Sequence, residues 1–125
     1  MNREELMNMY DFTGKTFGVT GGAGTLGSDV VITLAGCGAD VMILDLNPSR
    51  LSAIKESLGP RADQVDGLQA DVLDRESLME AGAAISERFG ALYGLVNAAG
   101  GNNPRATVSA DMSFFDIPEE GMRFV

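Results

Sequence analysis

A glycine-rich segment carries the strongest chemical signal in the chain. It lies between a short stretch rich in β-formers and an apolar repeat with helical spacing, and it reads Thr20-Gly21-Gly22-Ala23-Gly24-Thr25-Leu26-Gly27. At such a strand-to-helix junction one glycine permits a tight turn, another lets the backbone approach a pyrophosphate, and the last lets the helix pack close to the strand. The free N–H groups and the positive dipole end of the helix then favour phosphates. A glycine-rich turn without a ligand is the alternative.

A carboxylate on the next strand strengthens the phosphate-binding interpretation. Asp45 ends an apolar run over residues 41–44, roughly 20 residues after the glycines, where it can accept hydrogen bonds from the hydroxyl groups of an adenosine ribose. A negative charge there also repels a 2′-phosphate, so NAD is favoured over NADP. A simple turn residue at a strand end is the alternative for Asp45. The cofactor-binding residues expected at this corner are Gly21, Gly24, Thr25, Leu26, Gly27, Asp45 and Leu46.

A second acidic residue follows a weaker third strand. Asp71 comes directly after residues 65–70, and Val72 is next. The Asp71 carboxylate could reach an adenine amino group while the N–H of Val72 meets the ring. The competing role is to cap the loop that follows. Beside the glycines and Asp45, the pair predicts contact with adenine.

Strands and helices alternate along the part of the chain that must hold these residues. Apolar runs without alternation predict buried strands at 16–20, 41–44, 65–70 and 92–96. Helical spacing predicts helices at 26–35, from Pro48 to about residue 58, and after Asp74. The expected caps are Gly36 and Gly38 for the first helix, Asn47 for the second and Asp74 for the third. This order is typical of βαβ units, so the fold class is α/β with a parallel sheet.

Composition excludes several classes of function. The formal charge of -9, with no cluster of Lys or Arg to offset it, argues against nucleic acid as a partner. The chain has no His, which argues against a metal site, and its single cysteine, Cys37, fits a reducing compartment and a small buried side chain. Residues 1–12 form a polar lead-in with no apolar run for a signal peptide or membrane helix, so we expect no membrane partner and a cytoplasmic location.

Four landmarks occur here in the order that one protein family shows. Together with the segment Asn97-Ala98-Ala99-Gly100, the glycines, Asp45 and Asp71-Val72 resemble the cofactor-binding half of short-chain dehydrogenases/reductases. The resemblance implies a Rossmann-type doubly wound parallel sheet of order 3-2-1-4. It implies truncation after the fourth strand, in a single partial NAD(P)-binding domain over residues 1–125. It also implies that Asn97, Ala98, Ala99 and Gly100 line the cofactor, with Ala98 in place of the usual second Asn.

The glycine spacing points to more than one branch of that family. Gly21, Gly24 and Gly27 have the spacing of the extended branch, which includes nucleotide-sugar epimerases and dehydratases. The other main branch places its middle glycine where this chain has Thr25, yet the segment at 97–100 favours that branch.

The end of the chain is similar to a subgroup of the family. Residues 98–107, 113–117 and 121–125 resemble sugar-acid enzymes of the D-mannonate oxidoreductase or fructuronate reductase type. That similarity places Asn102, Asn103 and Arg105 near the nicotinamide, where they could meet a polyol or a carboxylate of the substrate. A solvated loop is the alternative, because residues 101–125 show only loop chemistry and the first turn of a helix from Gly121.

The proton-transfer residues of that family have no counterpart in the sequence. The family uses a Tyr with a Lys four residues later, a Ser and an Asn. The only tyrosines, Tyr10 and Tyr93, are followed four residues on by Gly14 and Asn97. We therefore expect no catalytic residue in this chain and truncation before the catalytic set.

The resemblance sets out what the complete parent would do. It implies a homo-oligomeric enzyme that moves a hydride between NAD and a small molecule, either a sugar acid or another hydroxyl or carbonyl substrate. A non-catalytic nucleotide-binding module and a fragment of an extended-branch epimerase or dehydratase are the alternatives. The apolar fourth strand would form an open edge of the sheet, so self-association is expected.

Overall fold

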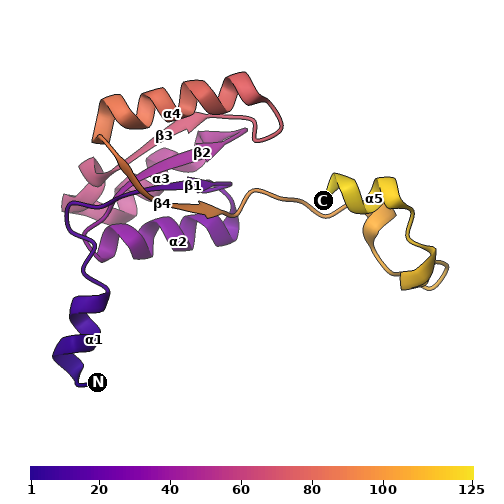
Figure 1. The fold of residues 1–125 in the computed structure, drawn as a ribbon, viewed down its shortest axis with the longest axis horizontal. Helices are drawn as coiled ribbons and strands as arrows, with labels where there is room; N and C mark the ends of the chain where they lie inside the picture. The colour runs from indigo at the N-terminus through magenta and orange to yellow at the C-terminus, as the bar shows by residue number, and fades with distance from the viewer.

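Four parallel strands form the centre of the protein. A computed structural model describes all residues, 1–125. Its strands are β1 (Thr16–Thr20), β2 (Asp40–Asp45), β3 (Val65–Gln69) and β4 (Leu92–Asn97), in the order β3-β2-β1-β4 (Figure 1). Every neighbouring pair is parallel, and Thr20 stands beside Leu44 on one side and Asn97 on the other. The Rossmann-type α/β sheet and its strand order are therefore confirmed.

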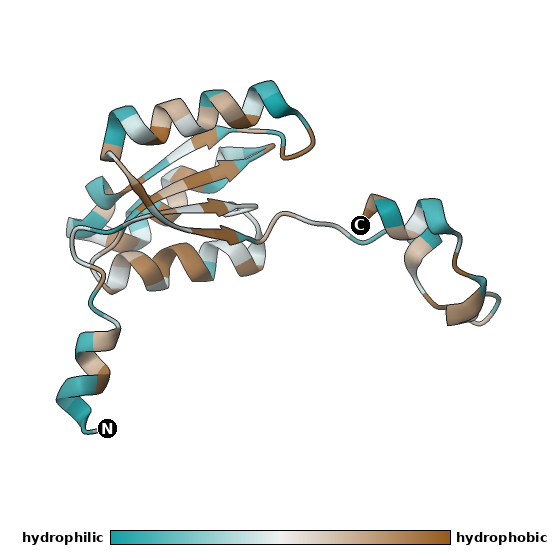
Figure 2. Ribbon diagram, in the orientation of Figure 1, coloured by the Kyte–Doolittle hydropathy of each residue, from teal (hydrophilic) through white to brown (hydrophobic).

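Helices cover both faces of this sheet, as the crossovers of a parallel sheet require. The helices α2 (Thr25–Gly36) and α3 (Leu51–Leu58) lie on one face and α4 (Arg75–Phe89) on the other (Figure 1). Successive side chains of a strand point to opposite faces. Val41 and Ile43 accordingly join the core against α2 and α3, while Met42 and Leu44 join the core against α4. Figure 2 shows hydrophobic colour along the strands and on α2.

Side-chain caps start two of the segments after the sheet strands. The side chain of Asn47 accepts a hydrogen bond from Ser49 N, and that of Asp74 accepts one from Glu76 N at 2.9 Å. Both caps were expected. Pro48, however, opens a 3₁₀ turn, η1 (Pro48–Arg50), and the α-helix begins only at Leu51.

The C-terminus of α2 corrects one expected cap. Gly36 is the last residue of the helix, and Gly38 takes the left-handed conformation with φ of +91°. Gly38 N donates to Ala35 O at 3.0 Å and Ala39 N to Leu34 O at 3.1 Å, which is the Schellman arrangement. Gly38 alone is therefore the glycine cap. Cys37, expected to be buried, is half-buried at this turn.

Both ends of the chain lie outside the sheet layers. The lead-in contains a helix that we did not expect, α1 (Arg3–Met9), which is capped by Asn2 and Glu5 and buries no residue. After β4 the chain forms the 3₁₀ turns η3 (Pro104–Ala106) and η4 (Phe114–Asp116) and the short helix α5 (Glu119–Phe124). This last segment projects away from the sheet (Figure 1).

Candidate nucleotide-binding site

The glycine-rich segment forms a tight turn between β1 and α2. Gly21 has φ of +64°, a conformation that favours glycine, and its N–H donates to Leu44 O at 2.7 Å. A Cβ on Gly21 would lie 2.7 Å from Ala98 O, and a Cβ on Gly27 would collide with Gly21 O. The two glycines therefore allow the loop, the residues after β4 and the first turn of α2 to pack together at one point.

The first turn of α2 presents unpaired amides next to this turn. Gly24 is the N-cap and brings no side chain to cap the helix. Ser28 N donates to Gly24 O at 2.9 Å, whereas the N–H groups of Thr25, Leu26 and Gly27 have no acceptor within the chain. Thr25 and Leu26 are exposed. Free amides at the positive end of a helix dipole form a binding site for an anion such as a phosphate.

Asp45 lies beside the loop because β1 and β2 are neighbours. Its Oδ2 accepts a hydrogen bond from Ala23 N at 3.1 Å, and its Oδ1 accepts one from Asn47 N at 3.0 Å. Each carboxylate oxygen can accept more than one hydrogen bond, so capacity for a ligand hydroxyl is left. Leu46, the next residue, is exposed. The structure thus brings the Asp45 carboxylate and the free amides of residues 25–27 together at one place, which we call the glycine corner.

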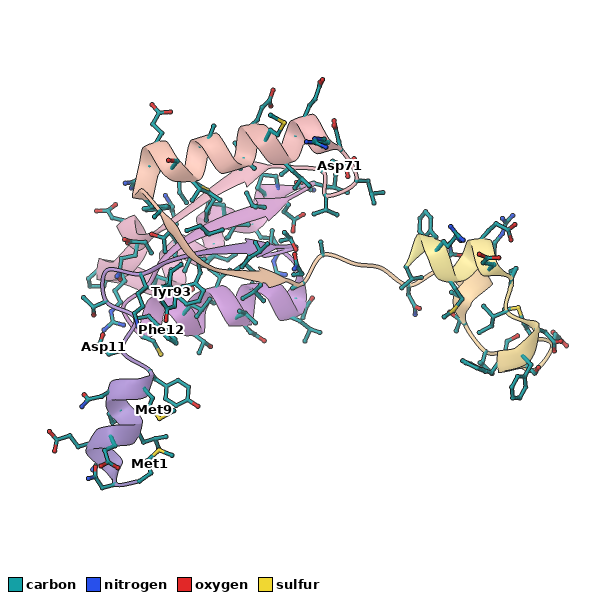
Figure 3. All side chains as sticks on the ribbon, viewed as in Figure 1. Met1, Met9, Asp11, Phe12, Asp71 and Tyr93 are labelled. Carbon is teal, nitrogen blue, oxygen red and sulfur yellow. The ribbon has the colours of Figure 1, made fainter.

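Asp71 and Val72 come shortly after the end of β3, the neighbour of β2, and so lie at the same end of the strands as Asp45. Figure 3 labels Asp71 there. The two strand ends are connected, since Ala70 N donates to Asp45 O at 2.9 Å. The Asp71 carboxylate accepts from Leu73 N at 2.9 Å, which is the capping role considered as the alternative. Val72 is exposed. The remaining oxygen of Asp71 has no partner in the chain, so capping and ligand contact are compatible.

The segment after β4 closes the other side of the corner. Ala98 N donates to Thr20 O at 3.2 Å, and Ala99 N donates to the Thr20 hydroxyl at 3.1 Å. The four residues from Asn97 to Gly100 are exposed. Thr20, the buried residue that orients this segment, was not among the expected site residues. Its position directly before the first glycine of the turn is the sequence feature that could have identified it as a site residue.

The three residues expected near a substrate lie elsewhere. Asn102, Asn103 and Arg105 belong to the segment that leaves the sheet after β4 (Figure 1). The Asn103 side chain caps η3 by accepting from Arg105 N at 2.9 Å, and Thr107 Oγ1 donates to Asn102 Oδ1 at 3.3 Å. The structure does not bring them to the glycine corner, and their hydrogen bonds are those of a local loop.

Neither tyrosine belongs to the corner. Tyr93 packs edge-on against Phe17, with ring centres 5.5 Å apart, and Lys15 Nζ lies 4.7 Å from its ring centre. Figure 3 shows Tyr93 near Phe12, far from Asp71 at the opposite end of the sheet. Tyr10 follows α1 and is exposed. Tyr93 therefore packs against Phe17, and Tyr10 is a surface residue.

The chain shows neither a cluster of metal ligands nor a membrane-spanning helix. No three His, Cys, Asp or Glu side chains lie close enough together to hold a metal ion. No helix has both the length and the apolar character needed to cross a membrane.

The comparison with known proteins decides the family. The family model described as short chain dehydrogenase matches residues 15–117. The chain belongs to this family. The match starts just before β1, runs through the glycine corner and ends before α5. The family that the four landmarks resemble is therefore confirmed, and it is a family of oxidoreductases.

Individual short-chain dehydrogenases share both the sequence and the fold of this chain. The uncharacterized oxidoreductase UxuB of Bacillus subtilis is 36% identical over 119 residues, which are 89% of this chain and 43% of that protein. A structure assigned to a D-mannonate oxidoreductase of Haemophilus influenza, with bound NAD, matches with a TM-score of 0.76 and 27% identity, over 96% of this chain and 46% of the other. The similarity to a D-mannonate oxidoreductase is thus confirmed.

Cofactor type varies among the similar structures. The NADPH-dependent 3-quinuclidinone reductase of Rhodotorula rubra matches with a TM-score of 0.73 and 26% identity, over 93% of this chain and 44% of that protein. Members of the family therefore bind NAD or NADP. The chain spans less than half the length of each of these relatives.

Proposed function

We propose that this chain binds NAD at the carboxyl edge of its sheet. The observation that carries the proposal is the juxtaposition of the free Thr25, Leu26 and Gly27 amides with the Asp45 carboxylate across two neighbouring strands. The amides suit a pyrophosphate, and the carboxylate suits the hydroxyl groups of the adjoining ribose. Gly21 and Gly24 give the phosphates access to the backbone.

The remaining corner residues fit the rest of the same ligand. Asp71 and Val72 lie one strand beyond Asp45, where an adenine attached to that ribose would extend. The segment from Asn97 to Gly100 lies on the opposite side of the glycine loop, on the way to a nicotinamide. In this assignment the dinucleotide crosses the ends of β3, β2, β1 and β4, as in a doubly wound sheet.

The preference for NAD over NADP rests on Asp45. Its carboxylate is held by Ala23 N and Asn47 N, so it cannot swing away from a 2′-phosphate without breaking two hydrogen bonds. The negative charge of this carboxylate would repel the negative charge of a 2′-phosphate on the ribose beside it. We therefore expect NAD to bind at least about tenfold more tightly than NADP, a difference of about 1.4 kcal/mol.

The reaction of the whole protein is proposed on the similarity to D-mannonate oxidoreductases. The protein would move a hydride between NAD and a sugar acid or another small hydroxyl or carbonyl compound. Arg105, with Asn102 and Asn103, would contact a carboxylate of that substrate once the segment after β4 lies near the corner. This chain contains no Tyr followed four residues later by Lys, so we propose that it contributes cofactor binding and not proton transfer. A cytoplasmic homo-oligomer stays a prediction.

Titration calorimetry with NAD and NADP tests the proposal. Asp45→Ala should weaken NAD binding by tenfold or more, because two positioned acceptor oxygens are lost. Asp40→Ala is the matched control: Asp40 begins the same strand at its other end and is only half-buried. Heat from NAD with the wild type and with Asp40→Ala, reduced in Asp45→Ala, supports the site. No heat with either nucleotide overturns it.

A further inference from the structure

Two arginines from the segment after β2 hold the two ends of α2. Arg50 Nη1 donates to Ala23 O at 3.2 Å, just before the helix begins. Arg61 Nη1 donates to Ala35 O at 3.2 Å and also to Gly36 O, where the helix ends. A cation at the C-terminus of a helix satisfies free carbonyls and the negative end of the dipole. Arg50 contacts the opposite end, where the dipole disfavours a cation, so helix capping does not explain it.

We propose that Arg50 is a positioning residue of the nucleotide site and fixes the peptide group between Ala23 and Gly24. This inference rests on the proposed function of the corner. The carbonyl of that peptide accepts from Arg50, and its N–H, on Gly24, donates to Gly21 O at 3.0 Å. The preceding N–H, on Ala23, donates to Asp45 at 3.1 Å. Two successive peptide groups are thereby fixed immediately before the free amides of α2.

The loop needs this support because of its composition. Gly22 and Gly24 flank Ala23, and glycines leave a chain more conformational freedom than any other residue. Ala23 itself is only 4% exposed, so its carbonyl has little access to water. A charged donor makes a stronger hydrogen bond to such a carbonyl than a neutral one. Arg50 therefore satisfies the carbonyl and removes a freedom that ligand binding would otherwise have to remove.

The Asp45 carboxylate also helps to place Arg50. Asn47 N donates to Asp45 Oδ1, and the Asn47 side chain accepts from Ser49 N in the turn that carries Arg50. From Arg50 the contacts continue to Ala23 O, and from Ala23 N back to Asp45 Oδ2. This closed ring of hydrogen bonds joins the ribose-facing carboxylate to the phosphate-facing amides. Arg50 is the one cationic member of the ring.

The test compares Arg50→Met with Arg61→Met in the full chain. Both substitutions keep an unbranched side chain and remove a guanidinium donor: Arg50→Met removes the donor to Ala23 O, and Arg61→Met removes the donor to Ala35 O and Gly36 O. Without ligand, Arg50→Met should speed hydrogen exchange at the amides of Ala23 and Gly24 by about tenfold, whereas Arg61→Met should do so at Gly38 and Ala39. Arg50→Met should also raise the Kd for NAD by about tenfold, and Arg61→Met should leave it unchanged in the folded protein.

Arg50→Lys gives a second readout, because it keeps the charge and a donor on a long side chain. Slow exchange at Ala23 and Gly24, with partial recovery of NAD affinity, supports positioning by hydrogen bond. Equal exchange and equal NAD affinity in Arg50→Met and wild type overturn the inference while the wild-type site stands. If wild type binds no NAD, the proposed function fails, and the ligand-free exchange still decides the role of Arg50 in the loop.

Discussion

The two edges of the sheet are built differently. On β3, Asp66 lies between Lys55 Nζ at 3.9 Å and Arg88 Nε at 3.5 Å, which reach it from helices on opposite faces. On β4, the side chains of Leu92, Tyr93 and Leu95 are 44–61% exposed, and no charged side chain occurs in the strand. Charged side chains at an edge strand block pairing with another chain, and an apolar edge invites it. The β3 edge is therefore protected and the β4 edge is not.

The two edge strands also differ in how much of their surroundings this chain supplies. Around β3, the helices α3 and α4 each contribute one side chain that forms an ion pair with the strand. Arg88 of α4 also donates a hydrogen bond to Asp63 O at 3.3 Å, just before the strand. Around β4, the outer row of backbone groups faces no strand. The glycine corner lies between the two edges of the sheet. Asp45 and Asp71 lie on the side of the protected β3 edge, and the segment from Asn97 to Gly100 lies on the side of the exposed β4 edge.

The largest effect should come from Leu95→Lys. If the β4 edge drives self-association, a charge there should shift the chain from oligomers to monomers, because a buried lysine is costly. Size-exclusion chromatography with light scattering measures this shift. Val108→Lys is the matched control, since Val108 is 56% exposed, close to the 51% of Leu95, and lies outside the sheet. A wild type that stays monomeric, or an equal effect of Val108→Lys, contradicts the role of the edge.

A pair of glycines compares the packing of the two edge strands. A Cβ on Gly94 of β4 would lie 2.6 Å from the Phe17 ring, which Phe12 and Tyr93 hold in place. Gly94→Ala should therefore cost about 1–3 kcal/mol of unfolding free energy. A Cβ on Gly67 of β3 would meet only the end of the flexible Leu51 side chain at 3.0 Å. Urea unfolding should show Gly67→Ala within about 1 kcal/mol of wild type.

Removing the charge from the β3 edge should have a smaller effect on stability. Asp66→Val breaks two ion pairs of partly exposed side chains, each worth about 0–1 kcal/mol. The same change leaves an apolar β-branched residue on an edge, so light scattering should show more association than in wild type. An unchanged association state would mean that Lys55 and Arg88 protect this edge without Asp66.

The smallest effect concerns Asp11, in the turn that leads to β1 next to Tyr93. Hydrogen bonds from the side chain and the backbone N–H of Thr13 lower the pKa of the Asp11 carboxyl, and Lys15 adds to the shift. A lowered pKa means that the charged form stabilises the fold above the ordinary value of about 4. That stabilisation is lost as the pH falls through the lowered pKa. An NMR titration of the carboxyl carbon should find its midpoint below that ordinary value. Thr13→Val removes the side-chain hydrogen bond and keeps the backbone one, so it should raise the midpoint part of the way back.

Much of this fold could be predicted because it depends on local patterns. The apolar runs of β1 and β2 and the caps at Asn47 and Asp74 occur within a few residues of the structures they specify. The helix α1 was also readable, since Asn2 and Glu5 form a capping box, but it lacks an apolar face against the core. The choice between Gly36 and Gly38 depended on where the last turn of α2 ends, a question that spacing alone does not settle.

The less predictable parts depend on contacts between distant residues. Arg50 meets Ala23 across 27 positions, and Thr20 meets Ala99 across 79, so neither partner can be identified from nearby sequence. Asn102, Asn103 and Arg105 have side chains suited to a substrate, yet their hydrogen bonds are local and their segment lies off the sheet. Their residue types indicated that they could contact a substrate. Whether they lie together with the rest of the site depends on tertiary placement, which the sequence does not give.

The contact between Gly21 and the residues after β4 connects the exposed edge of the sheet to the glycine-rich loop. The same short backbone segment is the continuation of an open edge strand and one wall of the loop that is proposed to hold NAD. A strand that paired with β4 would lie beside the residues directly before Ala98 and Ala99, the two residues that contact Gly21. By thermodynamic reciprocity, any factor by which such pairing changed the affinity of the loop for its ligand would equal the factor by which the ligand changed the affinity of the edge for its partner.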